Sequence, residues 1–231
     1  MKIKHYAIFN LPLKSLNSPE AWDALRSDNS EPQYHIPIKV AEYKEKVDES
    51  YYSPFAEWIV REAEKGGFNV AFSVGSGKGY LEYQVKKLKP SLDVVVSDYT
   101  SSILHLEKYE IFDGVFQFDI FNDHFPVDKT ALLIFPRIDT EFTDEQLIAI
   151  IKKCYDHGFE KICFIPGQLL SLRIAIGEVK TFVKAFLKRR RRTFCGYSRT
   201  TSLFRSLMIP YYEMTPTIIN QKKVFVLNKK K

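Results

Sequence analysis

Three glycines at alternate positions, Gly75, Gly77 and Gly79, stand between an apolar run that ends at Val74 and a segment whose apolar residues have helical spacing. Glycine lets the backbone turn sharply and lets a ligand lie close to the main chain at the start of a helix, where N–H groups lack helical partners. The chemistry that this pattern indicates is the binding of a nucleotide-like ligand in a loop between a strand and a helix.

The spacing of the glycines separates three classes of nucleotide-binding loop. A Walker A loop needs Gly-x-x-x-x-Gly-Lys before Ser or Thr, but Lys78 is followed by glycine and the first glycine position holds Phe72. A dinucleotide fingerprint counted from the first glycine needs its last glycine where Tyr80 stands. The pattern that remains is GxGxG, at residues 75–79.

Two acidic residues stand at the ends of the next two predicted strands. Asp98 follows the run 93–97, nineteen residues after Gly79, where a carboxylate can accept hydrogen bonds from both hydroxyl groups of a ribose. Asp119 follows the run 115–118, and because more acids come after it, an ordinary acidic loop is the competing interpretation. An acid at this position does not by itself separate the classes of nucleoside-binding enzyme, so the glycine spacing has to separate them.

In this order, the GxGxG loop, Asp98 and Asp119 resemble the class I S-adenosylmethionine-dependent methyltransferases, from about Val70 to the end of the chain. The resemblance implies S-adenosyl-L-methionine as the cofactor. It implies cofactor contacts from Gly75, Ser76, Gly77, Gly79, Asp98, Tyr99, Asp119 and Ile120. The chain departs from the family pattern at Ser73, where the family usually has an acid that contacts the ammonium group of the cofactor.

Apolar runs alternate with helical patterns after residue 66. We expect strands at 69–74, 93–97, 115–118, 131–135, 161–165 and 223–227, and helices at 77–88, 101–108, between Thr143 and Gly158, and at 169–188. Short apolar strands separated by helices indicate parallel pairing, because parallel neighbours need a crossover. With the resemblance, this order implies an α/β fold, a doubly wound, mostly parallel, seven-stranded Rossmann-like sheet with helices on both faces. Its ligand is expected at the carboxyl ends of the strands.

Residues 1–66 are expected to form a helical and loop extension that caps the substrate, and residues 67–231 the domain that binds S-adenosylmethionine. A helix is predicted from Ser53 to the glycines at 66 and 67. In the family, N-terminal segments often fold over the cofactor and shape the acceptor pocket. The resemblance therefore implies Tyr51 and Tyr52 as residues that contact the substrate.

The resemblance also implies in-line methyl transfer to an N or O atom of an acceptor, and three residues are candidates for catalysis. Arg137 and Asp139 follow the fourth predicted strand and are suited to binding an acidic substrate and to taking a proton, although an ion pair between them at a loop explains them equally well. His124 follows the third strand. The Pro-Pro-Tyr motif of nucleobase methyltransferases is missing at the fourth strand, so we predict a small-molecule acceptor, such as an acidic metabolite or a sugar.

Basic residues outnumber acidic ones, 34 against 28, and the segment 184–192 alone holds six of them without an acid. A charge run at a helix end is usually a solvated face. Its functional alternative is an RNA methyltransferase that binds RNA through the run from Lys188 to Arg192. A non-catalytic protein that binds the cofactor or a partner is a second alternative, which Ser73 favours, and a dehydrogenase is a third.

The three cysteines of the chain, Cys154, Cys163 and Cys195, lack CxxC spacing. Neither a disulfide framework nor a zinc cluster fits them, so we expect no metal site and a reducing, cytoplasmic location. No apolar run is long enough to predict a transmembrane segment or a secretory signal.

Overall fold

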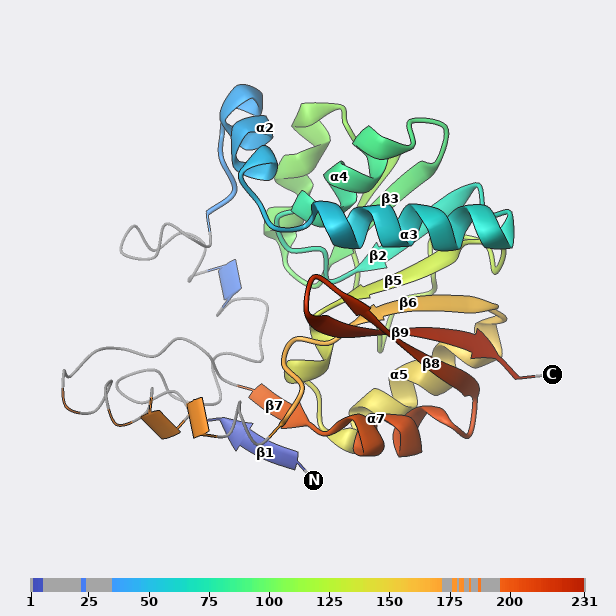
Figure 1. Cartoon of the computed structure of the whole chain (residues 1–231). Coiled ribbons are helices and arrows are strands. Elements are labelled where there is room, and N and C mark those ends of the chain that lie inside the picture. Colours follow the sequence, from blue (N-terminus) through green and yellow to red (C-terminus); the bar gives the residue numbers. More distant parts are fainter. Residues whose placement is uncertain are drawn as a thin grey trace.

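The computed structural model describes residues 2–5, 22, 23, 35–171, 176, 177, 179, 180, 183, 187 and 196–230. Its main element is a seven-stranded sheet, shown in Figure 1. In spatial order its strands are β4 (Gly114–Gln117), β3 (Asp93–Asp98), β2 (Val70–Val74), β5 (Leu132–Pro136), β6 (Lys161–Ile165), β9 (Lys222–Lys229) and β8 (Tyr212–Ile219). The first five strands in this order pair in parallel, whereas β9 is antiparallel to both of its neighbours. The predicted mostly parallel, seven-stranded sheet is therefore confirmed.

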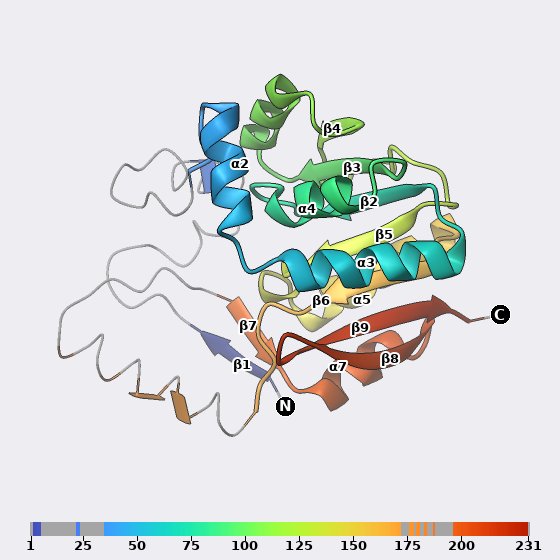
Figure 2. The same ribbon diagram turned by 45° about the horizontal axis from the view of Figure 1, so that its top comes forward.

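Helices cover both faces of this sheet (Figures 1 and 2). One face carries α3 (Ser53–Gly66) and α4 (Tyr80–Leu88), with α2 (Val40–Asp48) and the 3₁₀ helix η2 (Ser101–Tyr109) beside them. The other face carries α5 (Asp144–His157) and α7 (Thr201–Met208). A short 3₁₀ helix, η3 (Ile138–Thr140), follows β5. The doubly wound arrangement expected from the alternation of strands and helices is thus present.

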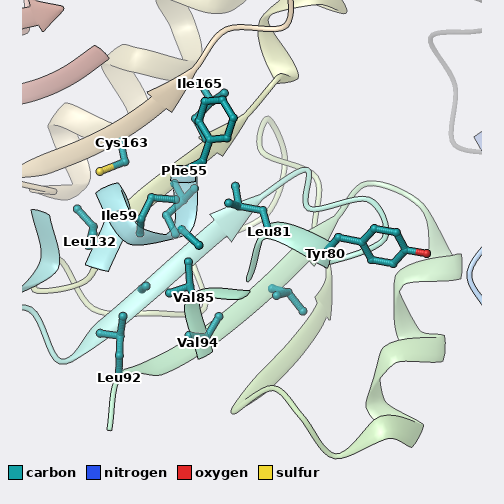
Figure 3. Close-up of a cluster of buried hydrophobic side chains, with 14 of the residues drawn as sticks. Phe55, Ile59, Tyr80, Leu81, Val85, Leu92, Val94, Leu132, Cys163 and Ile165 are labelled. Atoms are coloured by element: carbon teal, nitrogen blue, oxygen red, sulfur yellow. The ribbon is translucent and has the colours of Figure 1, made fainter. Parts of the chain in front are cut away.

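The central strand β5 is apolar along its whole length because both of its faces are packed against helices. On β5, Leu132 and Ile134 belong to the core on the side of α3 and α4, which Figure 3 shows, whereas Leu133 and Phe135 belong to the core on the side of α5. Successive side chains of a strand point to opposite faces, so a strand covered on both sides favours apolar residues at successive positions.

Two helices have the ends that the sequence predicts. Thr143 forms a capping box with Gln146 at the start of α5, and Gly158 ends that helix in the left-handed conformation, with φ 104°. Gly67 ends α3 in the same way, with φ 66°. The helix α4 starts at Tyr80, three residues later than expected from the sequence, because Gly79 is left-handed with φ 67° and cannot continue the helix.

Several elements were not foreseen. These are α7, β8 and a separate two-stranded antiparallel sheet of β1 (Lys2–His5) and β7 (Gly196–Arg199), whereas α2 falls within the extension that was expected to contain helices and loops. The helix expected at 169–188 falls mostly outside the described residues. Residues of α3 share one hydrophobic core with α4 and the sheet, and the domain boundary at 66 and 67 stays a prediction. In the described part of the chain, no helix combines the length and the apolar character needed to cross a membrane.

Candidate active site

The candidate site lies at the carboxyl edge of the sheet, where the strand order reverses. The chain leaves β2 for β3 and β4 on one side, and later adds β5 and β6 on the other side. In an open α/β sheet, such a reversal opens a crevice outside the carboxyl ends of the strands, where ligands bind. The carboxyl ends of β2, β3 and β5 meet there, with the three glycines after β2, Asp98 as the last residue of β3, and Arg137 after β5.

The glycine loop after β2 needs glycine for two separate reasons. Gly75, Gly77 and Gly79 have positive φ angles of 75°, 59° and 67°, which side chains with a Cβ rarely adopt. A Cβ on Gly75 would also lie 2.4 Å from Cγ2 of Ile138, in the segment after β5. The loop is therefore tightly turned and closely packed against the neighbouring strand end.

The backbone N–H groups of this loop are turned toward the protein. Four of them donate hydrogen bonds of 2.8–2.9 Å. The N–H groups of Gly75 and Ser76 both bind the backbone oxygen of Ser97. The N–H of Gly77 binds Oδ2 of Asp98, and that of Gly79 binds the backbone oxygen of Ser76. A loop that cradles a phosphate presents its N–H groups to the ligand instead. The geometry therefore agrees with the exclusion of a Walker A loop by the glycine spacing.

Asp98 is buried at the end of β3 and is held from two sides. Its Oδ2 accepts the hydrogen bond from Gly77, and its Oδ1 accepts bonds from the backbone N–H and the hydroxyl of Thr100, at 3.1 and 2.9 Å. The carboxylate is therefore tied directly to the glycine loop. The next residue, Tyr99, keeps 41% of its surface exposed at this edge.

A second carboxyl group lies behind the glycine loop, where the sequence has a serine in place of the expected acid. The hydroxyl of Ser73 donates a 2.6 Å hydrogen bond to Oε1 of Glu82, a fully buried residue in the first turn of α4. The other oxygen, Oε2, is buried and has no hydrogen-bond partner among the described residues. Burial raises the pKa of Glu82 to about 7, against the effect of the bond from Ser73, and the charge of Asp98 adds to the rise.

Sequence reasoning missed Glu82. It also missed Tyr43, a residue of α2 that contacts the glycine loop. The hydroxyl of Tyr43 donates a 2.9 Å hydrogen bond to the backbone oxygen of Lys78, and its fully buried ring contacts Tyr80. A signal for Glu82 existed, since it stands with Leu81 and Val85 on the apolar face of its helix. For Tyr43 we find no such signal, because the contact joins residues 35 positions apart.

The segment after β5 forms the second wall of the site. Arg137 has a left-handed backbone, with φ 67°, and the next residue, Ile138, packs against Gly75. Asp139 is fully buried, and its Oδ1 accepts a 2.7 Å hydrogen bond from the N–H of Gly167, in the loop after β6. Burial raises the pKa of Asp139 to about 6. The side chains of Arg137 and Asp139 do not form an ion pair with each other in this structure.

A buried arginine from β7 braces this segment. The guanidinium of Arg199 donates hydrogen bonds to the backbone oxygens of Asp139 and Phe142 and to Oδ1 of Asp144, the last at 2.7 Å. Lys2 of β1 binds the other oxygen of Asp144 at 2.9 Å. The small sheet of β1 and β7 thus fixes the loop that carries two of the predicted catalytic residues.

The structure brings some of the predicted site residues together. The hydroxyl of Tyr51 lies 3.5 Å from Nη1 of Arg137, and the ring of Tyr51 stacks on that of Tyr52, with centroids 4.4 Å apart. The residues predicted to contact the substrate therefore lie at the same edge as the loop after β5.

Other predicted residues lie in a turn after β4. The carboxylate of Asp119 accepts hydrogen bonds from the N–H of Phe121 and the side-chain amide of Asn122, at 2.9 and 2.6 Å. Ile120 is buried in the core beside α5, and His124 is exposed. In the described structure no hydrogen bond or ion pair joins His124 to Arg137 or to the glycine loop, and the roles of these three residues stay predictions.

The basic run from Lys188 to Arg192 lies outside the described residues, as does Cys195. Within the part of the chain that the structure describes, no group of three His, Cys, Asp or Glu side chains could hold a metal ion.

A scan of the sequence against protein-family models and a search of curated proteins each find no match. A search of solved structures finds the same fold in methyltransferases. Human N-acetylserotonin methyltransferase in complex with S-adenosylmethionine has a TM-score of 0.59 and 16% identity, over 76% of this chain and 52% of that chain. The mitomycin 7-O-methyltransferase MmcR has a TM-score of 0.63 and 14% identity, over 94% of this chain and 66% of that chain.

Magnesium protoporphyrin IX methyltransferase from Synechocystis PCC 6803 with bound S-adenosylmethionine has a TM-score of 0.56 and 12% identity, over 95% of this chain and 97% of that chain. This chain therefore has the fold of the class I S-adenosylmethionine-dependent methyltransferases, as the glycine loop predicted. It spans about half the length of the human enzyme and about two thirds of MmcR.

Proposed function

We propose that this protein is an S-adenosylmethionine-dependent methyltransferase that transfers a methyl group to an N or O atom of a small-molecule acceptor. The observation that carries the proposal is the contact between the glycine loop and Asp98, 2.9 Å from the N–H of Gly77 to Oδ2, at the point where the strand order reverses. The fold supports it, because structures that share this fold were solved with S-adenosylmethionine or its product S-adenosylhomocysteine.

The residues present fit this cofactor in two respects. S-adenosylmethionine has no phosphate, which suits a loop whose N–H groups are used within the protein. It has a ribose, and a buried carboxylate such as Asp98 favours hydroxyl donors. Gly75, Gly77 and Asp98 would hold the nucleoside, with the exposed ring of Tyr99 beside it. When bound, the cofactor supplies an electrophilic methyl group on a sulfonium.

The side chains of the protein would bind the acceptor and orient it toward the methyl group. Tyr51, Tyr52 and Arg137 are exposed or half-buried at the site edge and would contact the acceptor. Asp139, the predicted proton acceptor, is fully buried and bound to Gly167, so in this conformation it holds the loop. A role as base requires this loop to open.

Calorimetric titration with S-adenosylhomocysteine tests the proposal. We expect Asp98→Ala to weaken binding by about 1–3 kcal/mol, or about 5- to 150-fold in Kd, because charge-assisted hydrogen bonds are lost. Asp93→Ala is the matched control, since Asp93 is an exposed acid at the opposite end of the same strand. Equal affinity of the wild type and Asp98→Ala would place the ligand elsewhere, and tight binding of a nicotinamide dinucleotide instead would favour a dehydrogenase.

A further inference from the structure

Three segments that are far apart in the sequence meet beside the glycine loop. They are the residues before α3, the residue after β5 and the first residue of β9. In Figures 1 and 2 the turn between β8 and β9 reaches the end of the sheet at which α3 begins. The meeting brings Tyr51, Arg137 and Lys222 together, and the sequence interpretation assigned no role to Lys222.

Tyr51 contacts both cations of this cluster. Its hydroxyl lies 3.5 Å from Nη1 of Arg137, and the Nζ of Lys222 lies 4.7 Å from the centroid of its ring. Tyr52 stacks on the ring of Tyr51, with an interplanar angle of 28°. The hydroxyl of Tyr51 accepts from Arg137 and donates to the hydroxyl of Tyr52, at 3.5 Å. Two positive charges are thus gathered around one aromatic ring.

In the part of the chain that the structure describes, the two cations have no carboxylate partner. Among the described residues, no Asp or Glu lies within ion-pair distance of Arg137 or Lys222, although Lys86 and Arg199 both have such partners. Arg137 and Lys222 are both exposed, and Tyr51 keeps 45% of its surface exposed. Partial burial opposes ionisation of Tyr51, but its contact with the hydroxyl of Tyr52 and the charges of Arg137 and Lys222 lower its pKa. The local potential is therefore positive.

The cluster is fixed next to the candidate cofactor loop. Arg137 has a left-handed backbone, and its N–H donates a 2.7 Å hydrogen bond to the oxygen of Ile165. A left-handed residue with a long side chain is strained, and such strain is concentrated at functional sites. Ile138 packs against Gly75 of the glycine loop, and Arg137 is the residue just before Ile138 in the sequence. Arg137 therefore lies close to the glycine loop.

We propose that Arg137 and Lys222, the two cations that contact Tyr51, bind an anionic group of the acceptor, a carboxylate or a phosphate. A guanidinium offers paired N–H donors to such a group, and an ammonium adds a point charge. Held in this way, the anion orients the acceptor atom in the neighbouring crevice. The inference deepens the proposed function and rests on it, since it gives the acceptor of the methyl transfer a negative charge.

The test is a titration of the protein, with and without saturating S-adenosylhomocysteine, with benzoate, inorganic phosphate and benzamide. Binding is followed by calorimetry and by the NMR signals of the Tyr51 ring. These signals are assigned as the tyrosine signals that are missing in the variant Tyr51→Phe. Benzamide is the neutral analogue of benzoate. Lys223→Gln is the matched control for Lys222→Gln, because Lys223 is the next residue of β9 and its Nζ contacts Thr201 instead.

We expect benzoate or phosphate to bind and benzamide not to bind. Arg137→Gln and Lys222→Gln should each weaken anion binding about tenfold or more, because a charge-assisted contact is lost, and Lys223→Gln should leave it unchanged. The tighter of the two anions identifies the group. The inference would be overturned if Lys223→Gln weakened anion binding as much as Lys222→Gln, or if Arg137→Gln left the affinity for the anion unchanged. The affinity for S-adenosylhomocysteine is measured on the same samples. A failure of the proposed function, which would appear as missing S-adenosylhomocysteine binding, is therefore distinguished from a failure of anion binding.

Discussion

The buried carboxyl group of Glu82 is expected to make the protein less stable as the pH rises, and Glu82→Gln should remove this effect. In the folded state its pKa is raised to about 7, compared with 4.5 as the ordinary value. A group whose pKa is higher in the folded state favours folding when it is protonated. Its contribution is complete below pH 4.5 and is lost as the pH rises through 7.

The size of the effect follows from the two pKa values. A shift of one pKa unit corresponds to about 1.36 kcal/mol, so between pH 5 and pH 8 the wild type should lose about 2–3 kcal/mol of unfolding free energy through this group. Glutamine keeps an oxygen that can accept the hydrogen bond from Ser73 but does not ionise. The loss through this group should therefore disappear in Glu82→Gln.

Urea unfolding followed by circular dichroism at pH 5 and pH 8 measures the difference between the two proteins. Glu57→Gln is the control, because Glu57 is an exposed glutamate on the neighbouring helix α3. If the wild type and Glu82→Gln lose the same free energy over this pH range, the carboxyl group is not buried as described, and the reasoning fails.

Two further outcomes are expected. Gly75→Ala should weaken S-adenosylhomocysteine binding about tenfold or more in calorimetry, because the new Cβ meets Ile138 at 2.4 Å. Gly67 has a similar positive φ, 66° against 75° for Gly75, but no atom lies within 4 Å of a Cβ placed there. Gly67→Ala therefore tests the effect of backbone strain alone and should leave binding unchanged. Arg199→Met should lower the unfolding free energy by about 3–5 kcal/mol in urea titrations, because it leaves buried acceptors unpaired. A loss below 1 kcal/mol would show that Arg199 does not brace the loop after β5.

The main elements of the sheet and the position of the glycine loop could be predicted from the sequence. The signals are local, since an apolar run, alternate glycines and a capping box act on the backbone within a few residues. The strand before Gly75, the capping box at Thr143 and the acid at the end of β3 were all found in this way. Even the late start of α4 has a local cause, the left-handed Gly79.

The partners of the site residues were decided only by the tertiary structure. Ser73 stands where the family has an acid, and the carboxyl of Glu82 reaches it from the next helix because α4 packs on that face of β2. Likewise, Lys222 meets Tyr51 because β9 is inserted antiparallel between β6 and β8, which brings its first residue to the carboxyl edge. The backbone conformation of a short segment depends mainly on the residues within it and next to it, so the sequence predicts it. Contacts between distant segments depend instead on how whole helices and strands bury their apolar faces against each other.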